Sequence, residues 1–109
     1  MPKFTERTAL KEIVKFAKRE FREKRPQNVR VLRVKDEKIL SIGGPIPAIT
    51  IKETQVPYYI VVLDYGDMYR LYNFRKDGTL IGGENIEKTA DKMERIEKST
   101  KTEYIIMRR

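Results

Sequence analysis

Residues 58–74 read YYIVVLDY-GD-MYRLYNF, two runs of β-branched and aromatic residues joined by a Gly-Asp pair. Such runs favour strands, because their side chains fit a pleated and half-buried surface. Glycine at the first position of a two-residue loop is typical of a type II′ turn, whose twist matches that of the strands it connects. The stretch therefore predicts a β-hairpin with Gly66 and Asp67 at its tip.

The turn determines which residues of the hairpin face one another. With Tyr65 and Met68 closing the loop, the alternation of side chains sorts both strands into two faces. One face carries the cross-strand pairs Leu63 with Arg70, Val61 with Tyr72, and Tyr59 with Phe74. The other face carries Tyr58, Ile60, Val62, Asp64, Tyr69, Leu71 and Asn73. Neither set is plainly polar, so we expect helices or a partner to cover both faces for much of their length.

The composition limits the classes of protein to consider. The chain has 109 residues, which suits one domain that buries roughly two-thirds of its unfolded surface. It contains no cysteine and no histidine, which removes disulfides, thiolate metal sites and the usual general base at neutral pH. Without a membrane-spanning run or an apolar signal segment, we expect a cytoplasmic protein that does not enter membranes. Charged residues make up 37% of the chain, and we interpret this Lys- and Glu-rich balance as that of a thermophile.

Two helices are predicted on either side of the β-rich segments. The first begins at Thr5, which can cap the free amides, and ends at about Lys24, shortly before Pro26. Its expected apolar stripe consists of Leu10, Ile13, Val14, Ala17 and Phe21. The second is predicted from about Asn85 to Lys98. Its expected stripe consists of Ile86, Ala90, Met93 and Ile96.

Further strands are predicted at residues 29–34, 39–42, 48–52, 79–81 and 103–109. In the first of them Arg30 and Arg33 fall on opposite faces by strict alternation, which predicts a bulge or an edge position. Gly82-Gly83 is interpreted as the joint that leads into the second helix. The order α-β-β-β-β-β-(β)-α-β, with mostly short connections between strands, indicates a single α+β domain over residues 1–109. We expect a curled, mainly antiparallel sheet with one N-terminal helix and one helix close to the C-terminus.

The first helix carries the strongest functional signal. The net charge of +8 resides entirely in residues 1–35, where twelve Lys and Arg stand against four Glu. The cations gather on one flank and comprise Arg7, Lys11, Lys15, Lys18, Arg19, Arg22 and Arg25. Cations held on one rigid face match a run of phosphates, and counterion release then gives salt-sensitive affinity without sequence preference. We therefore expect nucleic acid as the partner; a plain solvated surface, acidic lipid or an acidic protein is the alternative for the same residues.

The hairpin offers a second signal, which is aromatic. Tyr59, Tyr65 and Tyr72 lie on the same expected face as Arg70 and Phe74. Bases of single-stranded DNA or RNA stack on such residues with little sequence preference. The alternative is that these rings form the core, as aromatic residues in a central hairpin usually do.

Two other functions remain open at this level. A protein-interaction module, such as a homodimer, would bury the second hairpin face and the Gly-Pro loop at residues 43–47 against a partner. A small nuclease would hold Mg²⁺ with Asp64 and Asp67 beside the hairpin turn. Since no set of side chains converges on a reaction, we expect no catalytic residues, no metal and no cofactor, and a protein that is not an enzyme.

Overall fold

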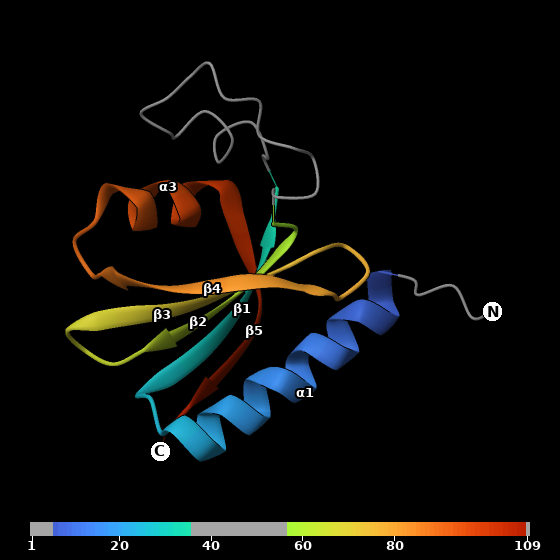
Figure 1. The fold of residues 1–109 in the computed structure, drawn as a ribbon, viewed down its shortest axis with the longest axis horizontal. Helices are drawn as coiled ribbons and strands as arrows, with labels where there is room; N and C mark the ends of the chain where they lie inside the picture. Colours follow the sequence, from blue (N-terminus) through green and yellow to red (C-terminus); the bar gives the residue numbers. More distant parts are fainter. Residues whose placement is uncertain (1–5, 36–56, 109) are drawn as a thin grey trace.

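A computed structural model describes residues 6–35 and 57–108 of the chain (Figure 1). Its elements in chain order are α1 (Glu6–Lys24), β1 (Asn28–Val34), β2 (Tyr59–Asp64), β3 (Met68–Phe74), β4 (Leu80–Glu87), α3 (Asp91–Ser99) and β5 (Thr100–Met107). All strand pairings are antiparallel, and the sheet order is β4-β3-β2-β1-β5. The predicted single α+β domain is therefore confirmed. The strands predicted at 39–42 and 48–52 lie outside the described residues.

The hairpin of β2 and β3 has the predicted register. Leu63 faces Arg70, and the partners continue in step to Tyr59 opposite Phe74. The amide of Tyr65 donates to the carbonyl of Met68 over 3.0 Å, which closes the two-residue loop. Gly66 has a φ of 91°, the positive value that a type II′ turn requires at its first loop position. Turn chemistry and alternation were sufficient to place these residues correctly.

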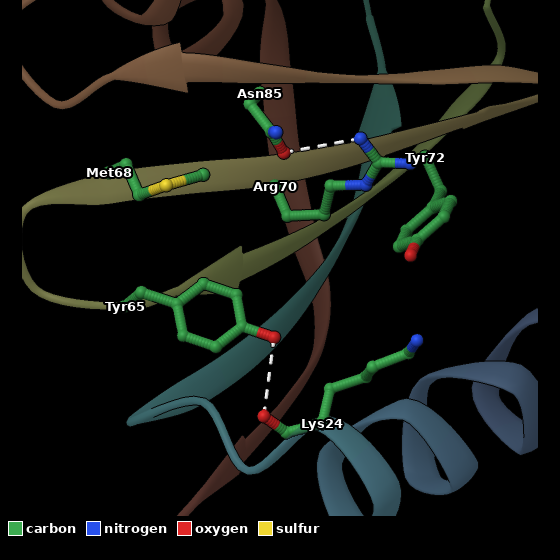
Figure 2. A pocket seen from close by; sticks show the side chains of 6 residues that line it. All are labelled: Lys24, Tyr65, Met68, Arg70, Tyr72 and Asn85. Carbon is green, nitrogen blue, oxygen red and sulfur yellow. Dashed lines mark hydrogen bonds between the residues drawn. The ribbon is translucent and has the colours of Figure 1, made fainter.

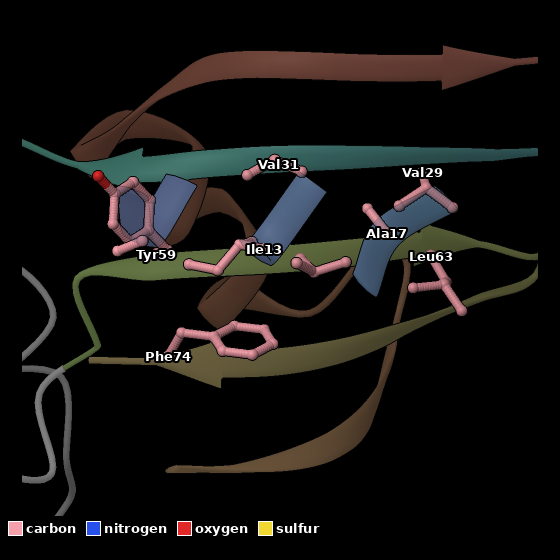
Figure 3. Packing of buried hydrophobic residues seen from close by; sticks show 9 residues of the cluster. Ile13, Ala17, Val29, Val31, Tyr59, Leu63 and Phe74 are labelled. Carbon is pink, nitrogen blue, oxygen red and sulfur yellow. The ribbon is translucent and has the colours of Figure 1, made fainter. Parts of the chain in front are cut away.

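Each face of the sheet is covered by a different helix (Figure 1). α1 lies over β1, with β2 and β5 on either side of it, while α3 lies on the opposite face. The core under α1 consists of Ala9, Ile13, Ala17, Val29, Val31, Tyr59, Val61, Leu63 and Phe74 (Figure 3). The core under α3 consists of Leu32, Val34, Ile60, Val62, Tyr69, Leu71, Met93 and Ile96. The expectation that both hairpin faces would be covered is confirmed.

The buried stripe of α1 differs from the predicted one by a small rotation. Ala9, Ile13 and Ala17 are the fully buried residues, whereas Leu10, Val14, Phe16 and Phe21 only border the core. The alanines let the helix axis approach the sheet closely, so the larger side chains spread along its two sides. The same rotation turns Glu20 inward, where it is only 8% exposed. Among the described residues, its Oε2 atom has no hydrogen-bond partner.

The predicted start of the second helix is wrong. Gly82-Gly83 lies inside β4, which continues to Glu87, and α3 begins only at Asp91. Gly83 faces Tyr72, and a Cβ atom at Gly83 would come within 2.9 Å of the carbonyl oxygen of Leu71. The glycine therefore permits a close strand contact rather than a helix start, and the open edge of β3 keeps this segment extended.

β1 lies in the interior of the sheet, so its predicted edge position is wrong, whereas the predicted irregularity is present. Its register with β5 shifts between Val31 and Leu32, where Tyr104 and Thr102 are the successive partners. The extra residue is Glu103, so the bulge lies in β5. β5 also begins at Thr100, three residues earlier than predicted.

Candidate nucleic-acid interface

The outward side of α1 is a continuous basic surface. Exposed side chains on it are those of Lys11, Lys15, Lys18, Arg19, Arg22 and Arg25, hereafter the basic face. At 100° per residue the five of these positions that belong to α1 lie opposite buried Ile13 and Ala17, so they point away from the sheet. Arg25 follows the last residue of α1. Arg7 belongs to α1, but its side chain lies outside what the structure describes.

Acidic neighbours neutralise little of this charge. Within the described part of the chain, the one ion pair of the basic face joins Lys15 Nζ to Glu12 Oε1 over 3.3 Å. Both side chains of that pair are more than half exposed, so the pair is weak and easily exchanged. The other five cations of the basic face have no carboxylate partner among the described residues. A phosphate that binds them can displace their counterions, and this release favours binding.

Aromatic rings fix several cations along the two sides of α1. Lys18 Nζ lies 5.6 Å from the ring centre of Tyr104, and the guanidinium of Arg19 lies 5.4 Å from that of Phe16. The guanidinium of Arg108 lies 5.6 Å from the ring centre of Phe21 and extends the basic surface beyond α1. Arg108 was not among the predicted site residues. Its position depends on the pairing of β5 with β1, which the local sequence pattern does not show.

A groove opens where the hairpin extends beyond α1 (Figure 2). Its volume is about 380 Å³, and its walls are Lys24, Tyr65, Met68, Arg70, Tyr72 and Asn85. The hydroxyl of Tyr65 donates to the carbonyl of Lys24 over 3.3 Å, which ties the hairpin to the end of the helix. Arg70 Nη1 donates to Asn85 Oδ1 over 3.1 Å, and the same guanidinium lies 5.0 Å from the ring centre of Tyr72.

The structure separates the predicted aromatic residues into two groups. Tyr59 is 1% exposed beneath α1, so its prediction as a stacking residue is wrong. Tyr65, Arg70 and Tyr72 are half-buried and meet in the groove, as Figure 2 shows. Tyr59 lies on β2, which adjoins β1 under α1, whereas Tyr72 lies on β3, one strand farther from β1. Phe74, at the end of β3 opposite Tyr59, still reaches the core under α1. From α1, the side chain of Phe16 contacts Tyr72 edge to face at 5.0 Å.

The groove keeps the phenol of Tyr65 protonated. Burial raises the pKa of Tyr65 above its ordinary value, nearby Tyr72 and the carboxylate of Glu20 raise it further, and Arg70 opposes them. The hydroxyl therefore remains a hydrogen-bond donor at neutral pH. Two rings, a guanidinium and an amide around one opening can accommodate a flat polar ring, for which stacking and edge hydrogen bonds are both available.

The carboxylate of Asp64, beside the turn, stabilises the turn through hydrogen bonds. Asp64 Oδ1 accepts a hydrogen bond from the amide of Gly66 over 2.8 Å and lies 3.2 Å from Lys88 Nζ. Asn28 Nδ2 donates to its other oxygen over 3.4 Å. In residues 6–35 and 57–108 no group of three or more metal-ligating side chains converges. Among these residues, no further ligand joins Asp64 and exposed Asp67 to form the Mg²⁺ site that a nuclease would need.

Replacing Asp64 with alanine is expected to lower the free energy of unfolding by about 1–3 kcal/mol at neutral pH, because two partly buried donors lose a charged acceptor. Burial raises the pKa of Asp64, but the hydrogen bonds from Gly66, Lys88 and Asn28 outweigh it and hold the pKa below 3.8. A carboxyl group whose pKa is lower in the folded state than in the unfolded state stabilises the protein at pH values above its unfolded-state pKa. This stabilisation is lost as the pH falls through the folded-state pKa. The difference measured in urea titrations should therefore shrink as the pH falls from neutral through the acid range in which Asp64 becomes protonated. Asp67→Ala removes an equal charge at an exposed position and should change little.

The second hairpin face is not available to a partner at its centre. Ile60, Val62 and Leu71 are at most 1% exposed beneath α3. The interaction surface predicted there is already occupied by the chain itself. The loop at residues 43–47 lies outside the described residues.

No family model, curated protein or solved structure matches the chain. Neither α1 nor α3, the helices within the described ranges, combines the length and apolarity needed to cross a membrane.

Proposed function

We propose that the protein is a non-enzymatic nucleic-acid-binding domain whose basic face contacts phosphates. The observation that carries this proposal is the exposure of the six cations of the basic face, which form a single weak ion pair with the described carboxylates. Stability does not require such an arrangement, since like charges three and four residues apart repel one another. The cations of the last turn, Arg22 and Lys24, also complement the helix dipole.

The dimensions of the basic face suit a nucleic-acid strand. From Lys11 to Lys24, its last residue, α1 rises about 20 Å at 1.5 Å per residue, and Arg25 follows directly. One strand of a duplex spaces its phosphates about 3.4 Å apart along the axis, so this length corresponds to roughly six phosphates. The basic face has the same number of exposed cations, six.

The groove beside the hairpin favours a single strand. A base can enter the space between Tyr65 and Tyr72 only when it is unpaired and unstacked from its neighbours. Arg70 offers its guanidinium to the base or its phosphate, and Lys24 connects the groove to the basic face. Phosphate contacts would provide the affinity, and the groove would provide the preference for single-stranded DNA or RNA over a duplex.

The salt dependence of binding tests this proposal. Fluorescence anisotropy with labelled single- and double-stranded oligonucleotides is expected to show log affinity falling linearly with log salt. The slope should approach −4 for a single strand, at about −0.7 for each of six phosphates. The single strand should also bind more tightly than the duplex at equal salt. Failure to bind either oligonucleotide at about 50 mM salt, where phosphate contacts are strongest, would refute the proposal.

A further inference from the structure

The two edges of the sheet are built differently. β4 and β5 are the edge strands. The β4 edge is protected by Gly82-Gly83, by the charges of Glu84 and Glu87, and by a register shift at its beginning. Lys92 from α3 forms an ion pair with Glu84 above this edge. Charges, glycines and irregular pairing are the usual means by which proteins prevent an edge strand from pairing with another chain.

The second half of β5 has none of these protections. Residues 104–107 are four consecutive apolar residues, and Tyr104, Ile105 and Met107 are 38%, 49% and 63% exposed. The bulge at Glu103, which makes the pairing irregular, lies in the first half of β5, so it does not protect residues 104–107. Ile105 and Met107 lie on the face of the sheet that α3 covers, but they project beyond the core under α3. Ile106 lies on the opposite face and borders the core under α1. Among the described residues, no strand pairs with the outer side of residues 104–107, and apolar side chains flank this part of β5 on both faces.

We propose that residues 104–108 pair with the same residues of a second copy, antiparallel, about a twofold axis at Ile106. A twofold axis perpendicular to a sheet pairs positions that are equally distant from it and keeps their faces in common. With the axis at Ile106, Ile105 faces Met107 of the other copy, and Tyr104 faces Arg108. Apolar residues then face apolar ones, and an aromatic ring faces a cation.

Neighbouring registers lack this complementarity. An axis at Ile105 would set Glu103 opposite Met107, and an axis at Tyr104 would set Lys101 opposite Met107. Either arrangement places a charged group against an apolar one, which weakens the pairing. The twofold register at Ile106 is thus the one that the side chains of this strand support, and it identifies a second copy as the occupant of the edge.

Arg108 is already positioned for the contact. Its Nε atom donates to the carbonyl of Pro26 over 3.0 Å, and its guanidinium lies 5.6 Å from the ring centre of Phe21. A Tyr104 ring from the second copy would approach a guanidinium whose position is fixed, which reduces the entropy lost on pairing. Both copies of α1 would then lie on the same side of the joined sheet, because a twofold axis perpendicular to the sheet keeps each face on its own side.

Salt should act on this contact in the opposite sense to phosphate binding. Each copy carries a net charge of +8, so the two copies repel one another at low ionic strength. Added salt screens that repulsion and leaves apolar burial intact. Sedimentation velocity at tens of micromolar protein should therefore show a dimer whose dissociation constant falls as salt rises from about 0.05 to about 0.5 M. A monomer throughout this range would overturn the proposal.

Two exposed apolar residues at opposite edges provide a matched pair of variants. Ile105 and Leu80 are both 49% exposed. Ile105→Lys is expected to raise the dissociation constant of the dimer by on the order of a hundredfold, because the pairing would bury an unpaired charge. Leu80→Lys adds the same charge on the β4 edge and should leave the dimer unchanged. Equal weakening by both variants would show that the contact is not at β5, and equal melting temperatures would exclude a folding defect.

A cysteine at the axis tests the register, since the chain has no cysteine of its own. Ile106→Cys would face its own copy across the axis at a distance that a disulfide can bridge. Mild oxidation should therefore give a covalent dimer of Ile106→Cys, and little of Thr102→Cys, whose copies would be far apart. Cross-linking of Thr102→Cys in preference to Ile106→Cys would overturn the register at Ile106.

Discussion

Replacing Lys11, Lys15, Lys18 and Arg22 with glutamine is expected to remove most of the affinity for nucleic acid and to leave the fold intact. Four phosphate contacts fewer would flatten the log–log salt slope for a single strand by about 2.8, at about 0.7 per phosphate. All four side chains are exposed, and glutamine keeps both the helix propensity and much of the stem length. The melting temperature should stay within a few degrees of the parent, or rise as like-charge repulsion is relieved.

The matched control removes four cations from the opposite side of the sheet. Lys88, Lys92, Arg95 and Lys98 lie on α3 or just before it, and their replacement by glutamine changes the net charge equally. Lys88, Lys92 and Lys98 each form an ion pair, so this variant should lose up to about 1 kcal/mol of stability for each pair. Its salt slope should stay close to that of the parent. If both quadruple variants weaken binding equally, the attraction depends on overall charge and the basic face is not a site.

The hairpin was predictable from the sequence because its determinants are local. Gly66 selects the turn, and the turn together with alternation fixes every cross-strand partner up to Tyr59 and Phe74. Gly82-Gly83 shows the limit of the same reasoning. A glycine pair before an amphipathic segment indicates a helix start when read locally, but here the open edge of β3 holds the segment in the sheet. Which strand lies at an edge of the sheet depends on the strand order, and the strand order cannot be predicted from a local sequence pattern.

The candidate site, too, could be predicted only where local sequence features determine it. The cations of α1 could be placed on the outer surface because charged side chains seldom lose their water. Tyr59 and Tyr72 could not be distinguished, since both are hairpin residues on one face in similar surroundings. Their difference depends on where α1 crosses the sheet: it covers Tyr59 and Phe74 but leaves Tyr72 half-buried. The apolar edge of β5 depends on the same long-range order.

Tyr59→Ala and Tyr72→Ala are expected to fail in different ways, although the two residues share a face of the hairpin. Tyr59 is 1% exposed in the core under α1, so its truncation should cost about 3–5 kcal/mol of the free energy of unfolding. For a domain of this size such a loss lowers the melting temperature by more than about 10 °C. Tyr72 is half-buried at the groove, where Phe16 contacts it edge to face. Its truncation should cost less stability but weaken single-strand binding by about 1–3 kcal/mol, the contribution of one stacked base.

Duplex binding is the internal control for Tyr72→Ala, because a paired base cannot enter the groove. The variant should bind a duplex as the parent does and lose only the preference for the single strand. Tyr59→Ala, measured well below its melting temperature, should retain both affinities because Tyr59 reaches neither the groove nor the basic face. If Tyr72→Ala folds and still binds the single strand as tightly as the parent, the groove takes no base, and the basic face alone accounts for binding. A melting temperature unchanged by Tyr59→Ala would instead contradict the packing of α1 on the sheet, on which the position of the groove depends.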